Sequence, residues 1–141
     1  MIMTRTQYAK IVRQEIADFL QLARRPTTPT YWRRIYYNYA RDLQAYAAWP
    51  ARLLSVVHEW HNKALEQIGY WEQMYEHARE HFSSFPMWPA LKRLYDDMIH
   101  SWHDIRLSTR RLMEVAEDRY KQEQTEAMYY PRVSVYYPRV R

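Results

Sequence analysis

Hydrophobic residues recur at intervals of three and four along most of this chain, a spacing typical of amphipathic α-helices. The first such stripe runs between Thr4 and Arg24, where Arg5 and Arg13 lie off it. Seven residues form the stripe: Tyr8, Ile11, Val12, Ile16, Phe19, Leu20 and Ala23. The pattern therefore predicts a first helix over 4–24, which ends at "RRPTTP".

A second helix is expected to follow Thr28 and Pro29, because threonine can cap a helix and proline at the first helical position loses no needed N–H. It is predicted to extend to about Ala48. Six residues form its apolar stripe: Trp32, Ile35, Tyr36, Tyr39, Leu43 and Tyr46. Another face carries Arg33, Arg34, Tyr37 and Arg41. The aromatic rings are thus expected mainly in the core, and the arginines on a separate basic ridge.

Two longer helices are predicted in the rest of the chain, from Ala51 to about Phe82 and from Met87 to about Glu126, separated by "SSFPMWP". The first has a wide apolar face: Leu53, Leu54, Val57, Trp60, His61, Ala64, Ile68, Trp71, Tyr75, Ala78 and Phe82. The second has apolar positions spaced alternately four and three: Leu91, Tyr95, Met98, Trp102, Ile105, Thr109, Leu112 and Ala116. This heptad seam predicts close packing against a nearly parallel or antiparallel partner helix.

The predicted fold is therefore all-α, a helical bundle of about four helices. It divides into a basic N-terminal helical arm (1–50), a helical bundle core (51–126) and an extended basic tail (127–141). The last two helices are expected to form an antiparallel hairpin, while the first two either pack on it or swing away as an arm. A single glycine argues against a turn-rich β architecture.

The tail "MYYPRVSVYYPRVR" repeats YYPRV at 129–133 and 136–140. Proline interrupts helices and pushes the preceding residue into an extended conformation, so an extended tail is predicted. A tail of this kind has no core of its own and is expected to lie on a neighbouring subunit or a ligand. The candidate subunit-interface residues are Tyr129, Tyr130, Arg132, Tyr136, Tyr137 and Arg139.

The net charge of +5 is unevenly distributed along the chain. Residues 1–52 carry nine Lys and Arg against three Asp and Glu, residues 53–126 carry nine against thirteen, and residues 127–141 carry three against none. Seventeen of the 21 basic residues are arginine, whose planar fork suits bidentate contact with phosphate. These observations predict sequence-independent binding of a polyanion by the N-terminal helices. The candidate residues are Arg5, Lys10, Arg13, Arg24, Arg25, Arg33, Arg34, Tyr37 and Arg41.

Catalytic chemistry has little support in the sequence. The chain has no cysteine, no glycine-rich phosphate loop and no GxSxG motif. "EHAREH" contains the HxxEH pattern, in which His77 and His81 would hold zinc and Glu80 would act as the base. No third ligand is identifiable, so packed or surface histidines are expected instead. We predict a protein that is not an enzyme and uses no metal or cofactor.

The basic helical segment Thr4–Ala48, with "ARRPTTPTYWRR" at its bend and a helical bundle after it, resembles the major capsid proteins of the filamentous viruses of hyperthermophilic archaea, the lipothrixvirus-like group. The resemblance implies that the chain pairs with its copies or with a paralogous coat protein. It also implies helical arms that wrap double-stranded DNA in the A-form, with a lipid envelope in some members. The implied location is the virion, and the host cytoplasm during assembly.

Other classes of function remain open from the sequence alone. A phage head-to-tail adaptor would use the tail to dock on a ring-shaped partner. A cellular DNA-binding protein without sequence preference would bind as a discrete dimer. A hydrolase would need zinc at the HxxEH motif, and a membrane-surface role would use the aromatic, basic N-terminal helices.

Overall fold

A computed structural model describes residues 2–129 of the chain, which form four helices. These are α1 (Arg5–Arg24), α2 (Thr30–Tyr46), α3 (Pro50–Phe82) and α4 (Trp88–Tyr129). No strand occurs among these residues, and the predicted all-α bundle of four helices is confirmed.

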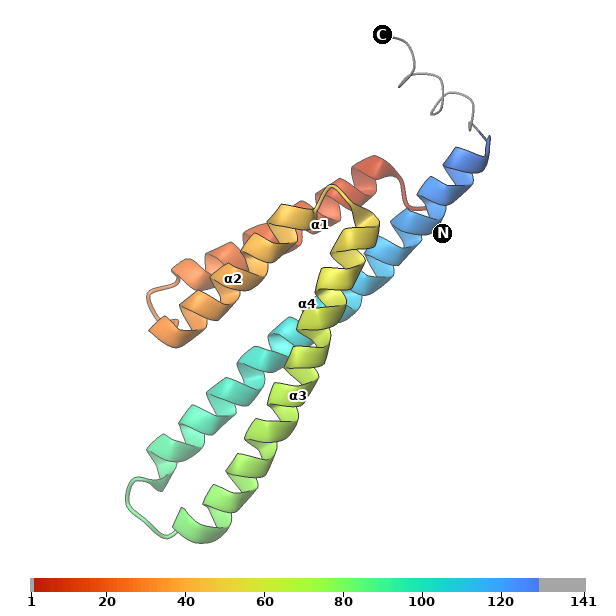
Figure 1. Ribbon diagram of the computed structural model, residues 1–141. Coiled ribbons are helices and arrows are strands. Elements are labelled where there is room, and N and C mark those ends of the chain that lie inside the picture. Colours follow the sequence, from red (N-terminus) through yellow and green to blue (C-terminus); the bar gives the residue numbers. More distant parts are fainter. Residues whose placement is uncertain (1, 130–141) are drawn as a thin grey trace.

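The four helices are arranged as two antiparallel hairpins (Figure 1). The α3–α4 hairpin has the most extensive helix–helix interface, as the heptad seam of α4 predicts. The shorter α1–α2 hairpin lies along one side of it, with α1 against α4 and α2 against α3. The far end of the α3–α4 hairpin projects beyond the shorter one (Figure 1).

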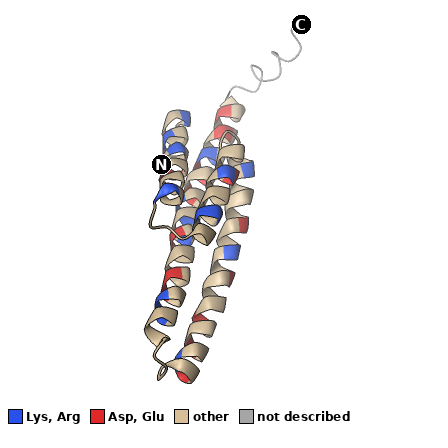
Figure 2. Cartoon of the chain, turned by 90° about the vertical axis from the view of Figure 1, so that its left-hand side faces the viewer, with Lys and Arg blue, Asp and Glu red and all other residues tan. Residues whose placement is uncertain are grey.

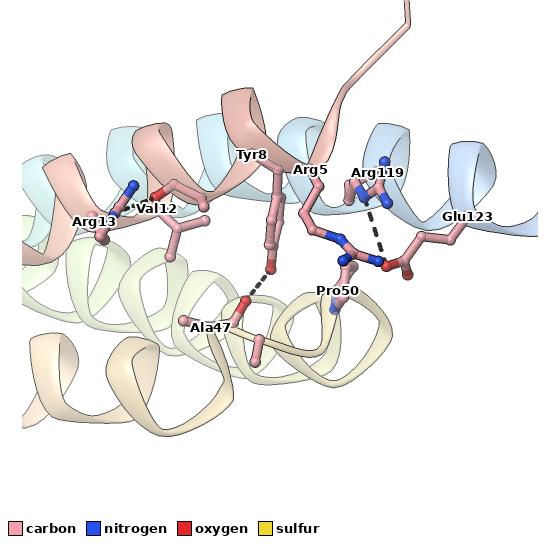
Figure 3. A pocket seen from close by; sticks show the side chains of 10 residues that line it. Arg5, Tyr8, Val12, Arg13, Ala47, Pro50, Arg119 and Glu123 are labelled. Atoms are coloured by element: carbon pink, nitrogen blue, oxygen red, sulfur yellow. Dashed lines mark hydrogen bonds and ion pairs between the residues drawn. The ribbon is translucent and has the colours of Figure 1, made fainter. Parts of the chain in front are cut away.

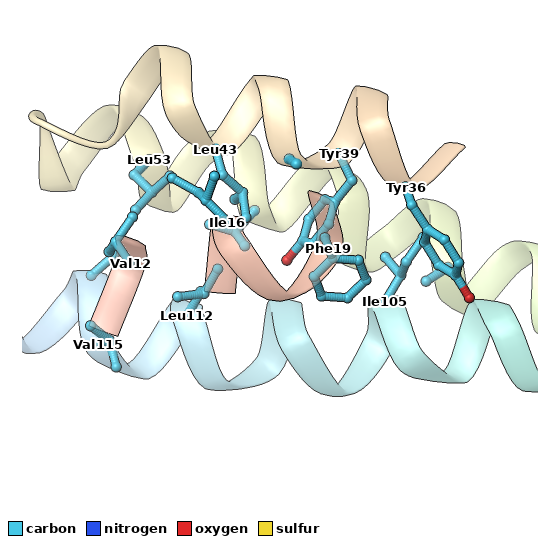
Figure 4. Close-up of a cluster of buried hydrophobic side chains, with 14 of the residues drawn as sticks. Val12, Ile16, Phe19, Tyr36, Tyr39, Leu43, Leu53, Ile105, Leu112 and Val115 are labelled. Atoms are coloured by element: carbon cyan, nitrogen blue, oxygen red, sulfur yellow. The ribbon is translucent and has the colours of Figure 1, made fainter. Parts of the chain in front are cut away.

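All four helices contribute to one hydrophobic core, which Figure 4 shows in close-up. Val12 of α1 and Leu43 of α2 lie in this core with Leu53 of α3 and Leu112 of α4. The ring of Phe19 packs edge-on against Tyr39 at a centroid distance of 4.8 Å. The N-terminal helices therefore pack on the bundle.

The N-termini of α1 and α2 are capped differently. Thr4 caps α1 in a capping box, because its hydroxyl accepts from the Gln7 N–H while the Gln7 side chain accepts from the Thr4 N–H. The predicted cap at Thr28 is wrong. Pro29 occupies the N-cap of α2, which has no side-chain cap, and the Thr28 hydroxyl donates to the Leu22 carbonyl at the end of α1.

Three further expectations at helix ends are corrected by the structure. Helix α2 ends at Tyr46, not Ala48, and the predicted core residues Tyr46 and Phe82 are 36% and 39% exposed. Each of these two residues is the last of its helix, where the apolar stripe runs past the end of the packed core. Helix α4 continues through 127–129, which the sequence pattern predicts as the start of the extended tail, because Pro131 restricts only the residue directly before it. Residues 130–141 lie outside the described residues.

Within residues 2–129, no helix has an apolar stretch long enough to span a bilayer.

Candidate nucleic-acid interface

The predicted basic face lies on the outside of the α1–α2 hairpin. Figure 2 views the molecule from the side of this hairpin, where Lys and Arg positions recur along both helices. All nine predicted nucleic-acid-binding residues are exposed, since they lie off the stripes that pack into the core. Four of them, Arg24, Arg33, Arg34 and Tyr37, surround one shallow groove of about 470 Å³ between the end of α1 and the start of α2.

Two of the three carboxylates in residues 1–52 point toward the other helices and form hydrogen bonds there. Glu15 is 8% exposed, accepts a hydrogen bond from the Ser108 hydroxyl at 2.6 Å and pairs with Arg111 at 3.5 Å. Asp42 accepts from the Trp60 indole N–H at 2.8 Å. The outer face of the hairpin is therefore left with a strong excess of positive charge.

None of the basic residues of α1, α2 or their connecting turn forms an ion pair within residues 2–129. Arg33 is nonetheless used structurally, because its guanidinium donates to the carbonyls of Arg25, Pro26 and Thr28 at 2.9–3.3 Å and holds the turn. Arg13 donates from Nε to the Ala9 carbonyl at 3.3 Å. The other predicted basic residues have no such hydrogen bond among the described residues: Arg5, Lys10, Arg24, Arg25, Arg34 and Arg41.

Two of the predicted arginines, Arg5 and Arg13, lie at a different concavity from the groove near Arg34. These two arginines line a cleft of about 510 Å³ between α1, the α2–α3 connection and α4 (Figure 3). The Tyr8 hydroxyl donates to the Ala47 carbonyl at 2.7 Å across this cleft. Burial raises the pKa of Tyr8 well above its ordinary value, so the phenol remains a neutral donor. The nine predicted residues thus form no single compact site.

Sequence reasoning missed Arg119, the most deeply buried cation of the described chain. Its side chain is 2% exposed, and it donates to the Met3 carbonyl at 3.0 Å and to Glu126 at 3.2 Å. Glu123 lies 3.6 Å from its Nε (Figure 3). Arg119 therefore links the N-terminal segment before α1 to the last turns of α4. The sequence did contain a signal for this buried cation. Arg119 continues the apolar seam of α4, and Glu123 and Glu126 follow it by four and seven residues, where they can pair with it on the helix.

The paired histidines lie in two different environments. His61 shares a hydrogen bond of 2.9 Å with the Thr109 hydroxyl, between α3 and α4. His77 and His81 are exposed and stack with ring centroids 4.2 Å apart. In the described part of the chain, no three or more metal-binding side chains are grouped to hold an ion.

The predicted subunit-interface residues lie almost entirely beyond the described chain. Tyr129 is exposed at the end of α4, whereas Tyr130, Arg132, Tyr136, Tyr137 and Arg139 lie outside the described residues.

Comparisons of the chain with protein-family models, curated proteins and solved structures gave no match. We therefore infer function from the geometry and charge of the chain itself. The fold places it among all-α proteins built from two helical hairpins, with a basic outer face on the shorter hairpin.

Proposed function

We propose that this protein is a structural virion protein, a major capsid protein that coats double-stranded DNA in a helical filament. The observation that carries the proposal is the outer face of the α1–α2 hairpin. Lys10, Arg24, Arg34 and Arg41 are exposed there without ion-pair partners, while Glu15 and Asp42 of the same hairpin point inward.

This arrangement suits contact with the DNA backbone and not with bases. The cations are distributed along two helices, and a rigid two-helix surface of this kind can meet phosphates at several points. Each phosphate contact releases counterions and adds about −0.9 to the slope of log K against log salt on B-form DNA. Repetition along a filament then multiplies weak contacts of single subunits into stable coverage.

The proposed partners are copies of the chain or a paralogous coat protein, with a lipid envelope outside the filament in some particles of this type. The proposed location is the virion, and the host cytoplasm during assembly. Nothing in this proposal requires a cofactor or a small-molecule substrate.

The test is a salt titration of binding to random-sequence double-stranded DNA with two matched variants. The first carries Lys10→Gln, Arg24→Gln, Arg34→Gln and Arg41→Gln. The control carries Lys63→Gln, Lys92→Gln, Arg93→Gln and Arg110→Gln, which are also exposed but lie on α3 and α4. Both variants lower the net charge from +5 to +1, since each loses four cations.

The slope of the first variant is expected to become shallower by about 3 to 4, because up to four phosphate contacts are lost. The control is expected to keep the parent slope. Circular dichroism of the DNA is expected to show the A-form when it is saturated with the parent chain. Equal loss of affinity in both variants would mean that only net charge matters, and the proposed interface would be wrong.

A further inference from the structure

The far half of the α3–α4 hairpin has no covering layer among the described residues. Trp32, near the start of α2, makes two contacts with α4: it packs on Trp102 at a centroid distance of 5.3 Å and donates to the Met98 sulfur. Beyond them the hairpin projects alone (Figure 1). Tyr70 and Leu94 in this part are each 51% exposed. This end of the α3–α4 hairpin is therefore open to contact by another molecule.

One flank of this projecting hairpin forms an acidic groove of about 440 Å³, lined by Glu72, Tyr75, Glu76, Asp96 and Ile99. Its floor is partly apolar, because Tyr75 and Ile99 are half-buried between the helices. Glu76 pairs with Arg79, whereas Glu72 and Asp96 have no ion-pair partner within residues 2–129. The groove thus offers unpaired carboxylates beside an apolar surface.

The segment of this chain that matches the groove chemically is the repeat YYPRVSVYYPRV. Residues 130–141 contain three arginines and no acidic residue, with aromatic and proline side chains next to the arginines. Building on the proposed filament, we infer that the acidic groove binds the YYPRV repeat of a second copy of this chain. Arg132 or Arg139 pairs with Glu72 and Asp96, while tyrosine and proline rings pack on Tyr75 and Ile99.

The two arginines of the repeat cannot reach Asp96 of their own chain. Asp96 lies 33 residues before Tyr129 on α4, a distance of about 50 Å along a helix. Arg139 lies ten residues after Tyr129, and ten fully extended residues span at most about 36 Å. The arginine side chain does not make up the difference. Each subunit therefore reaches the groove of a neighbour, an arrangement that extends head to tail into a filament.

Disulfide trapping tests the contact directly, because the chain contains no cysteine of its own. Full-length Ile99→Cys and Ser134→Cys chains are mixed and oxidised, with and without double-stranded DNA. The matched control replaces Ile99→Cys with Leu94→Cys, which is exposed on the same helix but about 140° around it. We expect several-fold more covalent dimer with the cysteine at position 99 than with that at position 94. Equal trapping at both positions, in both conditions, overturns the inference.

A chain with both Ile99→Cys and Ser134→Cys distinguishes a neighbour from the same subunit. Docking between copies predicts a ladder of covalent oligomers on a denaturing gel. Closure within one chain would give only a monomer of altered mobility, and docking between copies would then be wrong.

A charge-swap series separates this inference from the proposed function. Glu72→Lys with Asp96→Lys is expected to abolish long assemblies in sedimentation without weakening DNA binding at low occupancy. Adding Arg132→Glu and Arg139→Glu to the same chain is expected to restore assembly. The disulfide between positions 99 and 134 can form even if the Gln substitutions on α1 and α2 do not change DNA binding. That combination of results would contradict the proposed function but would support the contact between copies.

Discussion

At the scale of single residues, the core is joined by a buried chain of hydrogen bonds through three helices. Ser108 of α4 donates to Glu15 of α1, so its only proton is used, and the Tyr39 hydroxyl of α2 must donate to the Ser108 oxygen at 2.7 Å. Burial raises the pKa of Tyr39, which keeps this donor protonated. Arg111 balances the Glu15 charge from the surface.

Removing the middle of this chain tests its contribution to stability. Ser108→Ala leaves the Tyr39 hydroxyl and one Glu15 oxygen without partners in the core, and we expect a loss of about 1–3 kcal/mol in the free energy of unfolding. Chemical denaturation measures this loss. Ser55→Ala, at an exposed position of α3, is the control and should change little. Equal effects of the two substitutions would contradict the role of the network.

His61 predicts a pH dependence of stability whose sign follows from its environment. Burial lowers the pKa of His61 from its ordinary value of 6.5, and the charges of Arg106 and Arg110 lower this pKa further, whereas a hydrogen bond to the Arg106 backbone acts in the opposite direction. The unfolded chain therefore binds a proton at higher pH than the folded chain. The stability that His61 contributes is complete above pH 6.5 and is lost as the pH falls toward the lowered folded-state pKa.

The measurement is the midpoint of thermal unfolding between about pH 7.5 and 5 for three chains. His61→Asn can keep a hydrogen bond to Thr109 but does not titrate, so its midpoint is expected to fall less with acidification than that of the parent. The control is His77→Asn, which changes an exposed histidine near the other end of α3. A parent curve parallel to that of His61→Asn would show that this histidine does not contribute.

At the scale of the helices, the sequence predicted most of the structure because each helix packs through one continuous stripe. The seam residues of α4 from Trp102 to Ala116 are buried as expected. The failures occur where tertiary contacts override a local signal. Thr28 closes α1 and does not cap α2, since its hydroxyl finds the Leu22 carbonyl.

The pattern of hydrophobic residues also could not predict which charged side chains are buried. Glu15 and Arg119 occupy positions within the stripes, but a pattern of apolar residues counts them as surface side chains. Their burial depends on partners that are distant in sequence: Ser108 and Arg111 for Glu15, and Met3 for Arg119. Several of the predicted nucleic-acid-binding residues lie at two separate concavities, and the sequence could not show this because it depends on how the helices pack together.

The shared core predicts that the α1–α2 hairpin unfolds together with the α3–α4 hairpin. Leu43→Ala removes a fully buried side chain of α2 and should cost about 2–5 kcal/mol. The control Leu65→Ala, at a half-exposed site of α3, should cost much less. Far-UV circular dichroism and tryptophan fluorescence should report one common transition. An early transition confined to α1 and α2 would identify them as a separate arm.

At the scale of the whole molecule, charge is separated between the two hairpins. The α1–α2 hairpin has an outer basic face, and residues 65–101 at the projecting end of α3–α4 carry six acidic and three basic residues. A subunit with this polarity can contact a polyanion at one end while its other end contacts basic segments of neighbouring subunits. This separation is the main physical reason to favour a coat protein over a compact DNA-binding dimer.

The measurement that tests the proposed coat function most directly is electron microscopy of the full-length chain mixed with linear double-stranded DNA of two lengths, combined with nuclease digestion. A coat protein predicts continuous filaments whose length scales with that of the DNA, and DNA protected along its whole length. Rings without nucleic acid would favour an adaptor. Isolated particles on otherwise digestible DNA would indicate a discrete DNA-binding protein, and either result would contradict the coat function.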